Sequence, residues 1–269
     1  MKATAPGAAA WLRSLRPSSR PAALMMPSWY ATPFAESLLF TASALEHLGM
    51  AFIAHKGTLL GALRLGGVLP WDDDADLFLV DAYAEDVSRL LGPLLQEHGF
   101  VLRFRSSGYY FSAYPRLAVP LHMGGLTEMG LMTRTGTDGD IHFDRHEPGR
   151  RLSEKELFPI RRIPFYGSHL PGPADSEAAV ARMYGALAGP EVMGRFKAPA
   201  LAAEAVAFWR TARPVDGPQD WEAISRRMRT RSRDPAFHLA QAACSAWYLA
   251  NRSYWMAVDG LRRAAGGAR

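Results

Sequence analysis

Four aspartates stand close together in this chain, just before a short apolar run: Asp72, Asp73, Asp74 and Asp76. The run, Leu77 to Val80, is bounded by turn residues and is typical of a buried strand. Because side chains on a strand alternate between its two faces, Asp74 and Asp76 are predicted to point the same way. Two such carboxylates repel each other and need an opposite charge nearby. Oxygen ligands without cysteine favour Mg²⁺ or Mn²⁺ over zinc, so the pattern predicts a metal site on Asp74 and Asp76.

The residues upstream of the acids could hold phosphate groups. Gly57 and Thr58 open a predicted short helix, Leu59 to Leu65, that ends at a Gly-Gly pair. Backbone N–H groups at such a helix start, together with the Thr58 hydroxyl, suit a phosphate. Lys56 could face the same phosphates or lie in solvent at a strand end. Arg64, in the last turn, could reach the phosphates or stabilise the helix C-terminus.

The acids alone allow a simpler interpretation. A run of aspartates after Pro-Trp is typical of a solvated turn. The helix start before the acids and the apolar strand after them together favour a binding site over such a turn.

The segment from Gly57 to Leu77 resembles the signature of the LicD/fukutin family, in which a Gly-Ser or Gly-Thr helix start and an acidic Pro-Trp turn precede a core strand. Two further segments extend the resemblance to roughly residues 40 to 186. Residues 140–143 stand where the family has a short strand bearing a third carboxylate. Residues 157–185 resemble a later region of the family that is rich in Pro and Gly.

Asp140 is favoured as the third carboxylate by its position beside a short strand and by this resemblance. It is expected to be a metal ligand or the base that takes the proton of an acceptor hydroxyl, and Asp144 is its nearest competitor. His142 and His146 lie beside these acids, but their spacing matches no strong zinc pattern. Ala75 replaces a β-branched residue usual in the family and removes no ligand.

The resemblance also implies a function. Members of the family transfer phosphocholine or a phospho-polyol from a CDP-linked donor to a glycan. The main expectation is therefore a cytoplasmic, Mg²⁺- or Mn²⁺-dependent transferase with a CDP-linked donor and a glycan acceptor. Two alternatives stay open: transfer of a nucleotide to a small molecule, and a non-catalytic module that binds a nucleotide or a glycan.

The elements that must position these residues alternate between helices and strands. Helices are predicted over Phe34–Leu48 and Ala84–His98, and strands over Ala51–Ala54, Phe100–Arg105 and Tyr109–Tyr114. This order favours an α/β (α+β) fold. The resemblance implies a nucleotidyltransferase-like mixed sheet flanked by helices.

The chain is predicted to have three regions: a mobile leader over residues 1–30, the catalytic domain over 34–190, and a helical C-terminal region over 199–269. Helices in the last region are predicted over Leu201–Arg213, Trp221–Arg229 and Pro235–Ala265. Their aromatic side chains are more typical of packing against the catalytic domain than of an acceptor platform.

Composition limits the partners. The formal net charge of +5 suits phosphate-bearing substrates or an anionic membrane surface. The sequence has no basic stripe interleaved with aromatic residues, so a nucleic-acid partner is not expected. The single cysteine, Cys244, excludes an internal disulfide framework and a cysteine-rich zinc loop. No segment is long and apolar enough to span a bilayer, so peripheral contact is the closest membrane association expected.

Overall fold

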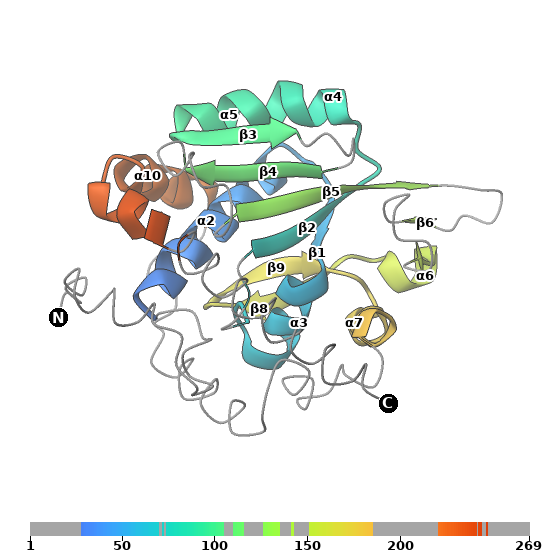
Figure 1. Ribbon diagram of the computed structural model, residues 1–269. Helices are drawn as coiled ribbons and strands as arrows, with labels where there is room; N and C mark the ends of the chain where they lie inside the picture. Colours follow the sequence, from blue (N-terminus) through green and yellow to red (C-terminus); the bar gives the residue numbers. More distant parts are fainter. Residues whose placement is uncertain are drawn as a thin grey trace, which may run out of the picture.

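A computed structural model shows how these elements assemble around a mixed sheet (Figure 1). It describes residues 28–69, 72, 74–104, 110–115, 126–134, 141–142, 151–184, 220–240, 242–243 and 246.

The sheet is built around a parallel pair of strands. Its main path has the order β1 (Phe52–Ala54), β2 (Asp74–Val80), β5 (Leu126–Arg134), β4 (Tyr110–Pro115) and β3 (Phe100–Phe104). Only β2 and β5 run parallel in this path, and every other neighbouring pair is antiparallel. Two short strands, β6 (Ile141–His142) and β7 (Arg151–Leu152), extend the far end of β5.

The centre of the sheet is buried, which explains the apolar character of β2. All residues of β2 after Asp74 are buried, including both Leu77 and Phe78 on opposite faces. A strand covered on both sides reads as a continuous apolar run rather than an alternating one. The prediction of a buried strand that begins at the aspartates is therefore confirmed.

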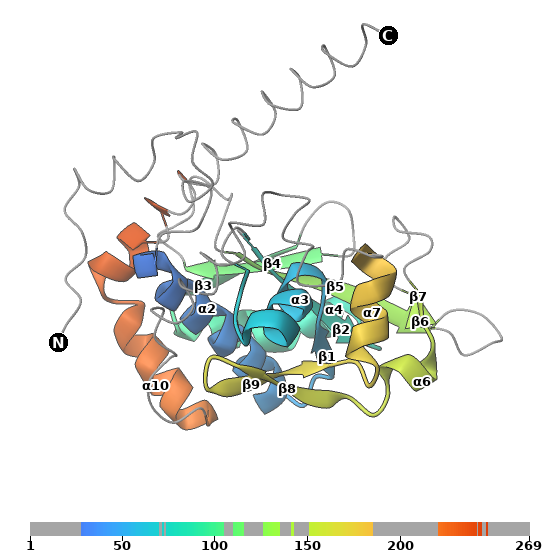
Figure 2. The ribbon, with the colours of Figure 1, turned by 90° about the horizontal axis from the view of Figure 1, so that it is seen from below.

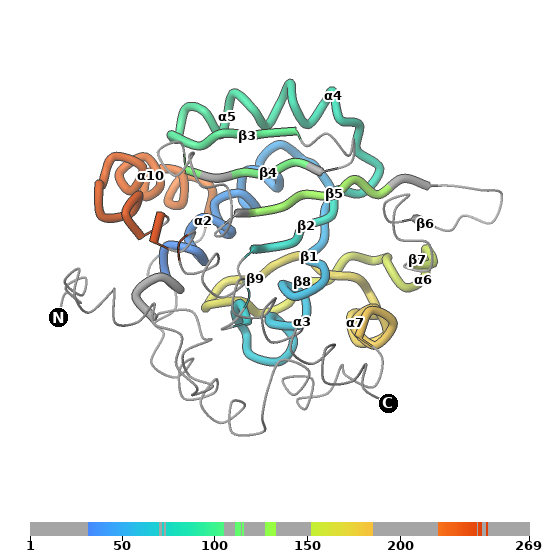
Figure 3. The backbone as a smooth tube through the Cα atoms, in the orientation of Figure 1, coloured from blue at the N-terminus to red at the C-terminus, as the bar shows by residue number. Residues whose placement is uncertain are grey.

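One long helix covers the sheet on one side. Helix α2 (Ser28–His47) packs against β4 and β5 (Figures 1 and 3). Its buried side chains include Phe34, Leu38 and Phe40, and the Phe40 ring lies 4.9 Å from that of Phe100 on β3. The predicted helix is confirmed, and it begins at Ser28, inside the segment interpreted as a leader. Residues 1–27 lie outside the described part of the chain.

A second helical segment lies along β3 and contains a local irregularity. It comprises α4 (Ala84–Asp86), a π-helical turn η2 (Val87–Leu91) and α5 (Gly92–Glu97), where the sequence predicts one continuous helix. Pro93 lacks a backbone N–H and cannot complete the regular ladder, which accounts for a wider turn immediately before it. The segment ends at Gly99, whose φ of 75° is in the left-handed region.

A β-hairpin fixes the end of helix α3 (Lys56–Leu65). The hairpin is formed by β8 (Arg161–Phe165) and β9 (Ser168–Gly172), and it packs beside α3 and β1 (Figure 2). The N–H of Tyr166, at its tip, donates to the Gly66 carbonyl at 2.7 Å. A side chain at Gly67 would overlap the Tyr166 ring, so glycine is required there. Burial raises the pKa of the Tyr166 hydroxyl.

Three further helices follow: α6 (Glu154–Leu157), α7 (Ser176–Tyr184) and α10 (Trp221–Arg231). Helix α10 confirms the prediction for that segment and packs against α2. Residues 235–240 are also helical, as predicted. The predicted helix over 201–213 lies outside the described residues. Among the helices of the described residues, none combines the length and apolar character needed to cross a membrane.

Candidate metal centre

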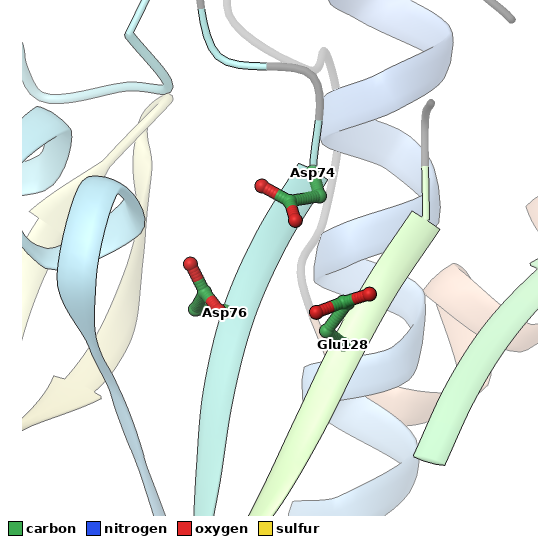
Figure 4. A group of neighbouring side chains, drawn as sticks. All are labelled: Asp74, Asp76 and Glu128. Carbon is green, nitrogen blue, oxygen red and sulfur yellow. The ribbon is translucent and has the colours of Figure 1, made fainter. Parts of the chain in front are cut away.

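Three carboxylates converge where β2 and β5 begin (Figure 4). Asp74 and Asp76 belong to β2 and Glu128 to β5, and one oxygen from each lies within 4.8 Å of the others. The sheet register explains this convergence, since Asp76 pairs directly with Glu128. Asp74 precedes Asp76 by two residues and therefore shares its face, as the sequence predicts. Asp76 is 5% exposed, and Asp74 and Glu128 are partly buried.

The first turn of α3 and the residue before it hold Asp76 through both its backbone and its side chain. The backbone N–H of Asp76 donates to Thr58 Oγ1 at 2.8 Å, and its carbonyl accepts from the His55 N–H at 3.0 Å. The Lys56 ammonium lies 3.1 Å from Asp76 Oδ1. The start of α3 is thereby fixed against the strand that carries the acids.

Gly57 adjoins a fourth acid. A Cβ at Gly57 would overlap the carboxylate of Asp72, so only glycine lets the two approach this closely. The N–H of Leu59 donates to the His55 carbonyl, so the N–H groups of Gly57 and Thr58 lie in the first turn of α3 and point away from the helix. The expected phosphate-binding helix start thus directly adjoins the acid cluster.

Arg64 forms a bidentate ion pair with Glu177 on α7, with both N···O distances at 2.6 Å. This pairing lowers the pKa of Glu177 and raises that of Arg64. In this structure the guanidinium therefore links α3 to α7, an arrangement that neither sequence-based alternative includes. A role for Arg64 at the phosphates stays a prediction.

The donor set suits a hard divalent cation. Three carboxylates at this spacing provide oxygen ligands, which Mg²⁺ and Mn²⁺ prefer. Burial of Asp76 also favours an occupied site, because concentrated negative charge in a partly buried position is costly without a cation. The Lys56 ammonium supplies one positive charge beside these three carboxylates.

Sequence reasoning missed Glu128. Its signal was an acid inside the apolar segment from Leu126 to Met132, a position where an unpaired carboxylate is rarely found. The residue that the sequence favoured, Asp140, lies outside the described residues, as do Asp73, Asp144 and His146. Their roles stay predictions. Ile141, which follows Asp140, pairs with Arg134 at the opposite end of β5 from Glu128.

Comparison with known proteins identifies the family. Residues 49–175 match the model of the LicD/FKTN/FKRP nucleotidyltransferase domain, which places this part of the chain in the LicD/fukutin family. The chain is also 30% identical over 142 residues to the human ribitol 5-phosphate transferase FKRP and, to the same extent, to the mouse protein. The aligned segment covers 49% of this chain but only 27% of each relative.

Solved structures of nucleotidyltransferases are more distant. The lincomycin-bound lincosamide antibiotic adenylyltransferase LnuA is 12% identical, with a TM-score of 0.37 over 66% of this chain and 96% of its own. ANT(2'')-Ia in complex with adenylyl-2''-tobramycin is 15% identical, with a TM-score of 0.38 over 73% and 97%. These likenesses are too low to carry an inference about activity.

Proposed function

We propose that this protein is a divalent-cation-dependent transferase that moves a phospho-substituent, of the phosphocholine or phospho-polyol type, from a CDP-activated donor to a glycan hydroxyl. The observation that carries the proposal is the convergence of Asp74, Asp76 and Glu128 beside the start of α3. The match to the LicD/FKTN/FKRP domain and the similarity to ribitol 5-phosphate transferases support the class of transferred group.

Each part of the site has a proposed role. Asp74, Asp76 and Glu128 would hold Mg²⁺ or Mn²⁺, which when bound neutralises charge on the donor phosphates and the leaving nucleotide. Backbone N–H groups at Gly57 and Thr58 would bind donor phosphate oxygens. Attack by the acceptor hydroxyl on the phosphorus distal to the nucleoside would release CMP. Asp140 stays a candidate for the third carboxylate or the base.

Donor binding provides the first test. CDP-choline, CDP-glycerol and CDP-ribitol should be added to the protein with and without Mg²⁺ while its melting temperature is recorded. At a ligand concentration 100 times Kd, binding to the folded state alone contributes about 2.7 kcal/mol, so the matching donor should raise Tm clearly and only with metal.

Variants then test the assigned ligands. Asp76→Asn and Glu128→Gln should keep the fold and lose the metal-dependent donor shift, whereas Glu85→Gln, at an exposed acid, should retain it. Asp140→Asn in the same series tests the carboxylate favoured by the sequence. A full donor shift in Asp76→Asn would refute the proposal. Product analysis separates CMP release from the pyrophosphate that transfer of a nucleotide would release.

A further inference from the structure

Lys56 has an unusual backbone conformation. Its φ of 44° lies in the left-handed region, which residues other than Gly, Asn and Asp rarely adopt. Residues held there cost roughly 1–3 kcal/mol and persist only where their surroundings fix them. Lys56 is the first residue of α3, so this backbone geometry directs its side chain as the helix begins.

The contacts of the Lys56 side chain show where its charge lies. Its Nζ is 3.1 Å from Asp76 Oδ1 and 5.9 Å from the centre of the Phe78 ring. Phe78 follows Asp76 by two residues and shares its face of β2. The Lys56 side chain is 23% exposed and that of Asp76 is 7% exposed, so the two charges meet in a largely desolvated position. Attraction between charges is stronger there than in water.

This ammonium changes the charge of the acid cluster. The Lys56 ammonium offsets one of the negative charges in this cluster, at the carboxylate of Asp76. Sites with two metal ions commonly place the ions about 3.5–4 Å apart. A second ion bound through Asp76 Oδ1 would have to share the position that Nζ already occupies.

We infer that Lys56 is a fixed counter-ion for Asp76 that takes the place of a second cation, so that the wild-type chain holds one divalent ion and holds it less tightly than the bare carboxylates would. Lys56 is then a positioning residue acting through Asp76, not the phosphate contact considered from the sequence. The inference rests on the metal site of the proposed function.

Metal binding without donor tests this inference. Mn²⁺ should be titrated into the full chain, with free Mn²⁺ followed by electron paramagnetic resonance and the heat of binding by calorimetry. We expect one Mn²⁺ per wild-type chain. Lys56→Met and Lys56→Gly should bind the first Mn²⁺ at least fivefold more tightly, because the competing positive charge is gone. Lys56→Gly also removes the unfavourable φ, which offsets part of the stability that is lost with the ion pair.

Two controls separate a local effect from general charge. Lys56→Arg retains a positive charge and should bind Mn²⁺ with an affinity close to that of the wild type. Arg89→Met removes one positive charge from an exposed pair with Asp86 and should leave the affinity unchanged. Two ions on the wild-type chain, a gain below fivefold in both Lys56 variants, or an equal gain in Arg89→Met would overturn the inference. If the wild type binds no Mn²⁺, the proposed metal site itself fails.

Discussion

At the scale of single residues, the position of Asp76 depends on Thr58. Thr58 is 1% exposed, and its hydroxyl oxygen accepts the backbone N–H of Asp76 at 2.8 Å. Thr58→Val would leave that N–H buried without its acceptor, at a cost of about 1–3 kcal/mol in the free energy of unfolding. Thr58→Ser keeps the acceptor and loses one buried methyl group, worth about 0.8 kcal/mol. Urea denaturation of both variants measures the difference, and equal stabilities would contradict the assigned role.

Residue types and spacing predicted part of this site but not all of it. Strand alternation was enough to place Asp74 and Asp76 on one face. Glu128 is 52 positions further along the chain, and its approach to Asp76 depends on β2 and β5 pairing in parallel with a particular register. Local sequence does not specify such a pairing. The ion pair between Lys56 and Asp76 depends in turn on the backbone conformation at Lys56, which the sequence also does not show.

At the scale of elements, an ion pair joins α6 to α7. Both guanidinium NH₂ groups of Arg182 donate to the carboxylate of Glu156, which also accepts the Ser153 N–H at 2.7 Å in a capping box. The hydrogen bonds from Arg182 are the main reason that the pKa of Glu156 falls from 4.5 to about 2. Because Arg182 is 37% exposed, solvent screening limits the contribution of the pair to about 0.5–1 kcal/mol.

This lowered pKa predicts how stability changes with pH. A carboxyl group whose pKa is lower in the folded state contributes stability above its unfolded pKa, and that contribution is lost as the pH falls through the folded pKa. Glu156→Gln should therefore be less stable than the wild type at pH 7. The difference should shrink as the pH falls from about 4.5 towards 2. Urea denaturation from pH 7 to pH 3 measures it, with Glu97→Gln as an exposed control. A difference that stays constant down to pH 3 would contradict the assigned ion pair.

The elements themselves were predicted where their signals are local. Helix α3 is capped by Gly66, whose φ is 66°, and the two strands predicted over Phe100–Arg105 and Tyr109–Tyr114 are present as the antiparallel pair β3 and β4. The π-helical turn before Pro93 was not predicted, because the periodic apolar pattern is the same for both kinds of helix. Strand β5 was not predicted either, although it pairs with the acid-bearing strand and adds Glu128 to the carboxylate cluster.

At the scale of the whole molecule, α10 lies beside α2 (Figures 1 and 2), and polar and aromatic contacts join it to the rest of the fold. Ser225 Oγ lies 2.7 Å from His98 Nε2, which also accepts from Arg229 Nε at 3.3 Å. His98 Nδ1 must then carry the proton and donate to the Leu94 carbonyl, at 2.8 Å. The Trp221 ring stacks on His47 at 4.7 Å. This part of the C-terminal region therefore packs against the fold, as its aromatic residues indicate.

Of these contacts, we expect the ion pair between Arg231 on α10 and Glu36 on α2 to contribute most to the free energy of unfolding. Arg231 Nε lies 3.0 Å from Glu36 Oε2, and Glu36 is 7% exposed. Burial raises the pKa of Glu36 even though Arg231 opposes this change. Arg231→Met removes the guanidinium that pairs with a buried carboxylate and should reduce the free energy of unfolding by about 2–3 kcal/mol. The loss is smaller than for a fully buried pair because Arg231 is 36% exposed and Arg227 also stabilises the charge of Glu36.

The deficit of Arg231→Met should depend on the charge of Glu36. It should shrink at acidic pH, because a protonated Glu36 no longer needs the guanidinium, and Glu36→Gln combined with Arg231→Met should recover part of the loss at pH 7. Arg233→Met, at an exposed arginine just beyond α10, should change the free energy of unfolding by less than about 0.5 kcal/mol. Urea denaturation of the four proteins measures these differences. If Arg231→Met and Arg233→Met are equally stable, the ion pair between Arg231 and Glu36 does not contribute to holding α10.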